Sequence, residues 1–187
     1  PAYIELHIAQ GPVLAADGKD IGIVTAIVGI ETLQFTFRGA ARHAGTTPLE
    51  ARKDAFRGAA AAVTDVYEQA AGGAWGDEVR VNFGAVEVLP GAGNVVPQTV
   101  RLTCEIRGTT VERMADIKGR VAKCLEASAG RFGLSLECST LSYDEPAAMD
   151  EGLGRLIERA SAGLGLSIRR MPSGAGHDAQ AFAPITP

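Results

Sequence analysis

The order of strand and helix patterns between residues 33 and 143 constrains the fold more than any other feature. Apolar and polar residues alternate in four stretches, which is typical of strands with one buried face. Apolar residues recur at helical spacing in two further stretches, 55–67 and 114–125. The alternating stretches are 33–38, 79–83, 100–107 and 134–138. The resulting order, strand–helix–strand–strand–helix–strand, predicts an α+β, ferredoxin-like βαββαβ domain with a four-stranded antiparallel sheet and two helices on one face.

Helix boundaries can be predicted from capping residues. Thr47, Pro48 and Glu50 form a capping box with proline at the first helical position, so we expect the first long helix to begin there. Asp150 precedes the apolar positions of another helix and is expected to cap it.

The segments that flank this pattern have a different character. We predict a strand over 3–8, a strand pair over 21–30 and, after the Asp150 helix, a strand over 166–170 that leads into a glycine-rich loop. We therefore predict that residues 1–29 and 145–187 belong to one domain, into which residues 30–144 are inserted. The sequence starts within a strand-like run and stops without an end signal, so we expect a piece of a longer protein.

Composition excludes several classes of function. The 187 residues carry a net charge of −4 and no basic cluster, which argues against nucleic acid or an anionic membrane as a partner. The apolar runs are shorter than the roughly 20 residues of a membrane span. The three cysteines, Cys104, Cys124 and Cys138, cannot all pair, and we expect buried free thiols and a cytoplasmic location.

All three histidines, His7, His43 and His177, lie at strand ends or in glycine-rich loops, where binding sites are commonly built. His7 could ligate a metal, and His43 could donate a hydrogen bond to an oxyanion. Arg107 could hold a carboxylate through two hydrogen bonds. The ordinary alternatives are loop bracing by each histidine and a surface ion pair of Arg107.

Two further loop residues also have ordinary explanations. Asn94 is explained by the turn in which it lies, and Asp178 by helix capping. The sequence contains no Gly-x-Ser-x-Gly elbow, phosphate loop or dinucleotide fingerprint, so the residues alone do not define a reaction.

Four motifs, taken together, carry a resemblance to a known family, and their order and spacing make it specific. They are Glu5–Pro12, Gly39–Pro48, Asn94–Pro97 followed by Glu105–Arg107, and Ser173–Ala179. In this respect the chain resembles the hydantoinase/carbamoylase family of dinuclear metallo-amidohydrolases, which includes N-carbamoyl-L-amino-acid hydrolases, β-ureidopropionases and allantoate amidohydrolases.

The resemblance implies a role for each candidate residue. Gln10 would contact the substrate and His177 would line the pocket. His43 would act in catalysis by stabilising the developing oxyanion, and also contact the substrate. Asn94 and Arg107 would hold the substrate carboxylate. The middle domain would be a lid that also forms a homodimer, inserted between parts of an α/β zinc-peptidase-like catalytic domain.

The resemblance also implies two divalent metal ions, Zn, Mn, Co or Ni, with His7 as one ligand. Ala9 stands where the family usually has Glu, which would alter the support of His7. The other ligands and the general base of the family have no counterpart in this sequence, so we expect this chain alone to be inactive and to bind no metal stably. A metallo-aminoacylase or dipeptidase, and a non-catalytic ferredoxin-like dimerisation module, are the alternatives.

Overall fold

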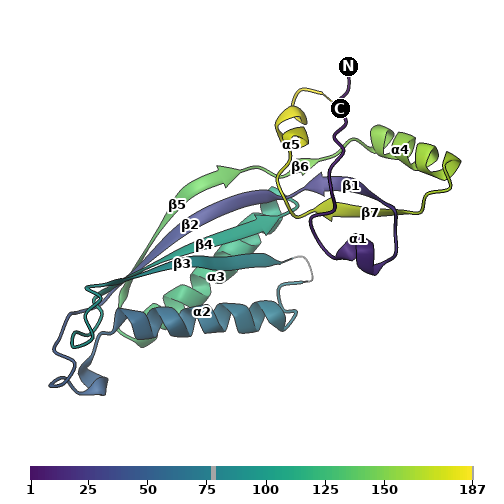
Figure 1. Ribbon diagram of the computed structural model, residues 1–187. Helices are drawn as coiled ribbons and strands as arrows, with labels where there is room; N and C mark the ends of the chain where they lie inside the picture. Colours follow the sequence, from purple (N-terminus) through teal and green to yellow (C-terminus); the bar gives the residue numbers. More distant parts are fainter. Residues whose placement is uncertain (77–78, 187) are drawn as a thin grey trace. The chain divides into compact units, whose positions relative to one another are not determined.

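The computed structural model describes residues 1–76 and 79–186, and the chain divides into two compact units (Figure 1). Unit 1 comprises residues 1–29, 107–111 and 144–187, and unit 2 comprises residues 30–106 and 112–143. The first boundary falls between Gly29 and Ile30, and the last between Tyr143 and Asp144. Each unit is described by itself.

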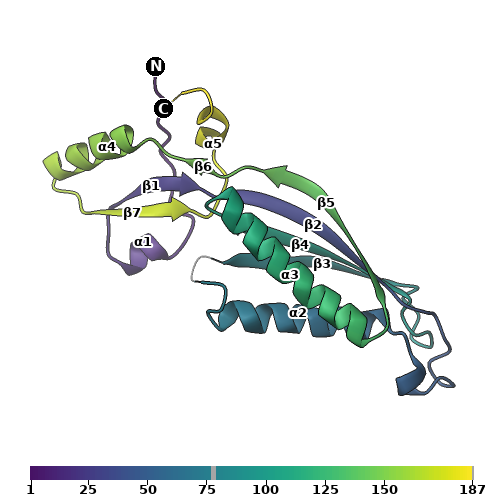
Figure 2. The ribbon, with the colours of Figure 1, turned by 180° about the vertical axis from the view of Figure 1, so that it is seen from behind.

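Unit 2 is built on a four-stranded antiparallel sheet with the order β3-β4-β2-β5, and Figure 2 shows helices α2 and α3 on one face of it. The strands are β2 (Gly29–Arg38), β3 (Arg80–Leu89), β4 (Thr99–Gly108) and β5 (Ser135–Asp144), and the helices are α2 (Ala55–Ala71) and α3 (Val111–Arg131). The α+β class and the four-stranded antiparallel sheet predicted from the alternation are confirmed.

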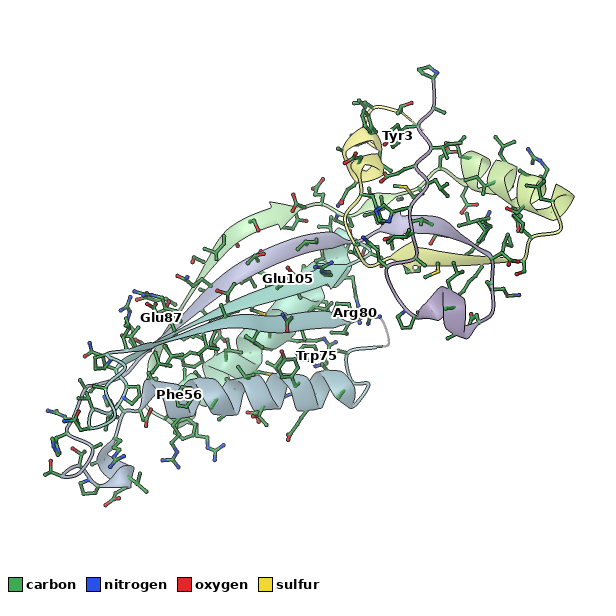
Figure 3. All side chains as sticks on the ribbon, in the orientation of Figure 1. Tyr3, Phe56, Trp75, Arg80, Glu87 and Glu105 are labelled. Atoms are coloured by element: carbon green, nitrogen blue, oxygen red, sulfur yellow. The ribbon has the colours of Figure 1, made fainter. Side chains whose placement is uncertain are left out.

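The core of unit 2 lies between the sheet and its two helices. The apolar positions of β2 and β4 are fully buried, as expected for strands covered on one face. Small residues of α2 allow close packing; a Cβ at Gly58 would lie 2.3 Å from Leu134 Cδ1. Trp75, the single tryptophan, follows α2 and is 2% exposed (Figure 3). The buried large apolar residues of β2 and β4 are Leu33, Phe35, Phe37, Val100, Leu102, Cys104 and Ile106.

A buried carboxylate lies on the helix-covered face of β2. Glu31 is 5% exposed, and its Oε1 accepts hydrogen bonds from Lys118 Nζ at 2.5 Å and Thr140 Oγ1 at 3.1 Å. A buried charge is costly unless it is paired and hydrogen-bonded. Lys118 of α3 and Thr140 of β5 meet that requirement, and they tie the helix and the edge strand to β2.

The predicted start of the first long helix is wrong. Residues Leu49–Ala51 form only a short 3-10 helix (η1), and α2 begins at Ala55. Asp54 is the true cap, because its Oδ1 accepts hydrogen bonds from Phe56 N at 2.9 Å and Arg57 N at 3.1 Å. A capping box is a local signal, and the extended residues after Ala51 override it here.

Unit 1 contains a three-stranded mixed sheet with the order β6-β1-β7. Strand β1 runs antiparallel to β6 and parallel to β7. Asp150 caps α4 as predicted, because its Oδ1 accepts a hydrogen bond from Leu153 N at 2.7 Å. The elements are α1 (Val13–Ala16), β1 (Ile21–Ile27), β6 (Ala147–Ala148), α4 (Glu151–Gly163), β7 (Ile168–Ser173) and α5 (Asp178–Phe182).

The predicted strand over residues 3–8 is not formed. The segment has no regular secondary structure, although Ile4, Leu6 and Ile8 alternate as in a strand. These three side chains are exposed, Leu6 at 93%. An alternating segment becomes a strand only when a neighbour completes its main-chain hydrogen bonds, and none of the described strands pairs with it.

The cysteines differ in exposure. All three are free thiols, as predicted, and Cys104 and Cys124 are buried. Cys138 is exposed, which corrects the expectation of three buried thiols, because it lies on the edge strand β5. No helix among residues 1–76 and 79–186 is both long enough and apolar enough to span a bilayer.

Candidate metal-ligand cluster and two loop sites

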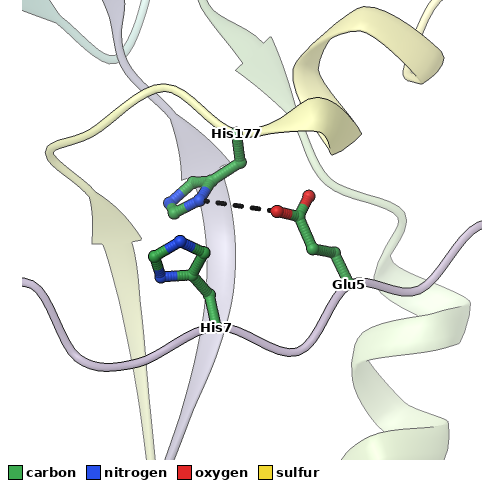
Figure 4. A group of neighbouring side chains, drawn as sticks. All are labelled: Glu5, His7 and His177. Atoms are coloured by element: carbon green, nitrogen blue, oxygen red, sulfur yellow. Dashed lines mark ion pairs between the residues drawn. The ribbon is translucent and has the colours of Figure 1, made fainter.

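Glu5, His7 and His177 come together in unit 1, as Figure 4 shows. One ligand atom from each lies within 4.8 Å of the other two. The two imidazole rings meet edge to face, with centroids 4.8 Å apart. His7 lies on the extended N-terminal segment, and His177 directly precedes α5, so the cluster joins segments that are far apart in sequence.

Hydrogen bonds orient both rings. His7 Nδ1 lies 3.0 Å from Ile8 O, so Nδ1 carries the proton and Nε2 keeps its lone pair. His177 Nε2 lies 2.6 Å from Ser173 Oγ, which itself donates to Ala175 O. Ser173 Oγ also accepts a hydrogen bond from Ala175 N at 3.3 Å, so a serine that is itself fixed by the loop holds the imidazole at Nε2. A backbone carbonyl or hydroxyl behind each imidazole is the usual support of a metal-ligating histidine.

The carboxylate of Glu5 is also held in place. Its Oε2 accepts a hydrogen bond from Ala179 N at 2.9 Å, in the first turn of α5, where negative charge is favoured. Its Oε1 lies 3.9 Å from His177 Nδ1. One carboxylate oxygen is thus fixed by the backbone while the other faces the histidine.

The donor set fits a divalent transition metal. Imidazole and carboxylate together suit Zn, Mn, Co or Ni. Ligand atoms around one tetrahedral ion lie roughly 3.4 Å apart. The cluster, at up to 4.8 Å, is slightly wider. Three donor atoms suffice for one ion but not for two bridged ions.

The environment of Tyr3 shows the effect of the carboxylates near this cluster. Its ring stacks on Phe182 of α5, with centroids 4.5 Å apart. Burial, and then the neighbouring carboxylates of Glu5 and Asp178, raise the pKa of the Tyr3 hydroxyl above its usual value. Gln10, predicted to contact a substrate, is exposed in the segment that follows His7.

His43 and Asn94 lie together on a second site in unit 2, formed by the loop after β2 and the loop before β4. His43 pairs with Val95 in an isolated antiparallel bridge. Ala44 N donates to Asn94 O at 2.8 Å, and Val96 N donates to Arg42 O at 2.9 Å. Main-chain hydrogen bonds therefore align the two loops, while the side chains of His43 and Asn94 are exposed.

Arg107 lies at the other end of β4. It is the last residue but one of the strand, and its Nη1 donates to Gly174 O at 2.6 Å, in the loop that leads to His177. Arg107 and Gly174 both belong to unit 1. From Thr99 to Arg107 a strand extends about 26 Å, at roughly 3.3 Å per residue. The hydrogen bond to Gly174 holds Arg107 beside the loop that carries His177.

Sequence reasoning missed Glu5 and Ser173. Glu5 lies two positions before His7, and in an extended chain residues two apart point to the same side, so this signal was available. Ser173 ends β7 four positions before His177, and no periodicity describes the conformation of the loop between them. Its contact with the imidazole becomes visible only in the structure.

Comparison with known proteins identifies relatives along the whole chain. No protein-family model matches it. The allantoate amidohydrolase of Escherichia coli (strain K12) is 34% identical over 186 residues, which cover 100% of this chain and 45% of that protein. The N-carbamoyl-L-amino acid amidohydrolase of Geobacillus stearothermophilus is 36% identical over 186 residues, with the same two coverages.

Solved structures agree. The crystal structure of a hydantoinase/carbamoylase family amidase from Burkholderia ambifaria matches with a TM-score of 0.88 and 31% identity, over 97% of this chain and 44% of that one. The chain thus spans a little under half the length of the relatives that it matches.

The structure thus combines an α+β fold with a cluster of two histidines and one carboxylate in unit 1. The chain is homologous to part of the hydantoinase/carbamoylase family amidases, as its motifs indicated, and corresponds to a little under half of the length of those proteins.

Proposed function

We propose that the chain takes part in hydrolysing the C–N amide bond of N-carbamoyl amino acids or allantoate, with water activated by two metal ions. It supplies mainly the part that grips the substrate and forms a dimer. The observation that carries this proposal is the similarity over all of this chain to relatives named for those two activities. The small-molecule substrate follows from the same relatives.

The metal centre would be held partly by unit 1. Two bound divalent ions would polarise the ureido carbonyl and lower the pKa of a bridging water. His7 would offer Nε2 as a ligand, since its Nδ1 faces Ile8 O. His177 and Gln10 would line the substrate pocket. Because the cluster found among residues 1–76 and 79–186 has donors for one ion and not for two, we expect the chain to be inactive without the remaining ligands of its relatives.

Unit 2 would be a ferredoxin-like lid, which its strand order supports. His43 would donate a hydrogen bond to the developing oxyanion, and Asn94 and Arg107 would hold the substrate carboxylate. In a homodimer, His43 and Asn94, whose side chains are exposed, would serve the site of the partner.

Two alternatives are weaker. A non-catalytic dimerisation module has no use for the cluster of His7 and His177, which lie together in unit 1 outside the helix-covered sheet. A metallo-aminoacylase or dipeptidase would share the same plan, and the names of the relatives argue against it. A cytoplasmic location, expected from the free thiols, stays a prediction.

A segment exchange tests the proposal. This chain replaces the matching segment of the Geobacillus stearothermophilus relative, and the chimaera is assayed with N-carbamoyl amino acids, allantoate and N-acyl amino acids in Mn, Zn, Co or Ni. Turnover of the first two classes, with a loss of at least about 100-fold in His43→Ala, is expected. A folded chimaera that turns over only N-acyl amino acids, or in which His43→Ala is fully active, would contradict it.

A further inference from the structure

The guanidinium of Arg52 donates hydrogen bonds to two carbonyls of the loop that carries His43. Arg52 Nε donates to Thr47 O at 2.9 Å, and Arg52 Nη2 donates to Ala44 O at 2.5 Å. Arg52 is half-buried, whereas His43 is exposed. The two carbonyls flank the turn after His43, so one rigid fork fixes both ends of that turn.

Arg52 is itself well anchored. The next residue, Lys53, accepts a hydrogen bond at its carbonyl from Ala40 N at 2.9 Å. Asp54 then caps α2, and Ala55 N donates to Pro97 O at 3.0 Å. The backbone that carries Arg52 is thereby tied to the segment after β2, to the helix and to the segment before β4.

Within the turn, Gly45 determines how the imidazole is presented. Gly45 N donates to His43 Nδ1 at 3.2 Å. A nitrogen that accepts a hydrogen bond carries no proton, so the neutral ring has its proton on Nε2. A Cβ on Gly45 would lie 3.1 Å from His43 Cε1, tighter than ordinary contact. Because Gly45 has no Cβ, the His43 ring can lie close enough to accept the hydrogen bond from Gly45 N.

We propose that Arg52 is a positioning residue for His43. By holding the carbonyls of Ala44 and Thr47, it keeps Gly45 N–H under Nδ1 and so presents Nε2–H as a fixed donor at the exposed end of unit 2. The catalytic use of that donor rests on the proposed function, but the positioning itself does not. Lysine at this position would keep the charge and lose the fork.

The ring tautomer of His43 provides the test. Nitrogen NMR of the neutral imidazoles is measured on the chain in weakly alkaline solution. The chain has only three histidines, and a His43→Gln variant assigns the signal. The wild-type chain should show Nε2–H. Arg52→Ala and Arg52→Lys should each reduce the ratio of Nε2–H to Nδ1–H about tenfold, the effect of losing a charge-assisted hydrogen bond.

Two further variants make the result decisive. Arg57→Ala is the matched control, since the guanidinium of Arg57 lies over the Phe132 ring, and it should leave the tautomer unchanged. Gly45→Ala should shift the tautomer as Arg52→Lys does. If Arg52→Ala does not fold, Arg52→Lys decides. A folded Arg52→Lys chain with the wild-type tautomer ratio overturns the proposal.

This design separates the proposal from the proposed function. The NMR result requires no turnover, so it stands or falls with the contacts of Arg52 alone. A shifted tautomer together with a fully active His43→Ala chimaera would remove the catalytic role and leave the positioning role intact.

Discussion

Individual residues show most clearly how environment sets chemistry in this chain. His7, His43 and His177 are the same residue type, yet each is oriented by a different partner: a carbonyl, a backbone N–H and a serine hydroxyl. The proton of the neutral ring therefore lies on Nδ1 in His7 and on Nε2 in His43. The three histidines are distinguished by their hydrogen-bond partners, and no sequence pattern predicts those partners.

Cys104 gives a prediction at this scale. Burial, followed by the charges of Cys138 and Glu105, raises the pKa of the Cys104 thiol to about 12. Because the thiolate is the reactive form, native protein at weakly alkaline pH should leave Cys104 unmodified by iodoacetamide while exposed Cys138 reacts. Mass spectrometry of labelled peptides measures this, and unfolded protein, in which both cysteines should react, is the control. Rapid labelling of Cys104 in the native state would contradict it.

At the scale of elements, alternation predicted strands well and local caps predicted helices unevenly. Strands β2 and β4 were found because one covered face leaves a clean period of two. Residues 3–8 show the same period without forming a strand, since pairing depends on a neighbour. Thr47 and Asp54 are both residue types that commonly cap helices. Longer-range contacts, such as the hydrogen bond from Ala55 N to Pro97 O, determine that the helix begins after Asp54.

Removing the Asp54 cap should destabilise α2. Asp54→Ala leaves Phe56 N and Arg57 N without their side-chain acceptor, so the free energy of unfolding should fall by about 1 kcal/mol. Denaturant titration followed by tryptophan fluorescence measures the change. Asp65→Ala, on the exposed middle of the same helix, is the control and should alter it by less than about 0.5 kcal/mol. Equal effects of the two variants would show that Asp54 does not act as a cap.

Asp20 should make unit 1 sensitive to acid. Hydrogen bonds from the Ser167 hydroxyl and backbone N–H lower the pKa of the Asp20 carboxyl, joining the start of β1 to the residue before β7. A lowered pKa stabilises the fold above the pKa of the unfolded chain, and this contribution disappears as pH falls through the folded-state pKa. Asp20→Asn should therefore be less stable than wild type at neutral pH and equal to it in strong acid, as thermal melts over pH would show. A stability difference that does not vary with pH would contradict this.

At the scale of the molecule, the two units differ in the size of their hydrophobic cores. The large buried cluster, including Trp75, belongs to unit 2, while the largest buried side chains of unit 1 are Ile23, Ile27 and Val28. Small cores give marginal stability. The order of elements in unit 2 could be read from the sequence because it repeats two simple periods. The meeting of Glu5 with His177 depends on segments at opposite ends of the chain.

This difference predicts two unfolding transitions. Fluorescence of Trp75 reports unit 2 alone, whereas far-ultraviolet circular dichroism reports both units. In urea, part of the dichroism should be lost before the fluorescence changes, because unit 1 unfolds first. The Asp54→Ala variant should move only the later transition. Superimposable curves from the two probes would show that the units unfold as one.

The bridge between His43 and Val95 bears on how this surface could diversify. The two loops are aligned by main-chain atoms, Ala44 N to Asn94 O and Val96 N to Arg42 O, and not by the side chains at positions 43 and 94. Those side chains can therefore be exchanged without loss of alignment. Simultaneous randomisation of both positions should yield a library in which most members fold, giving evolution or a protein engineer two adjustable contacts on one constant frame.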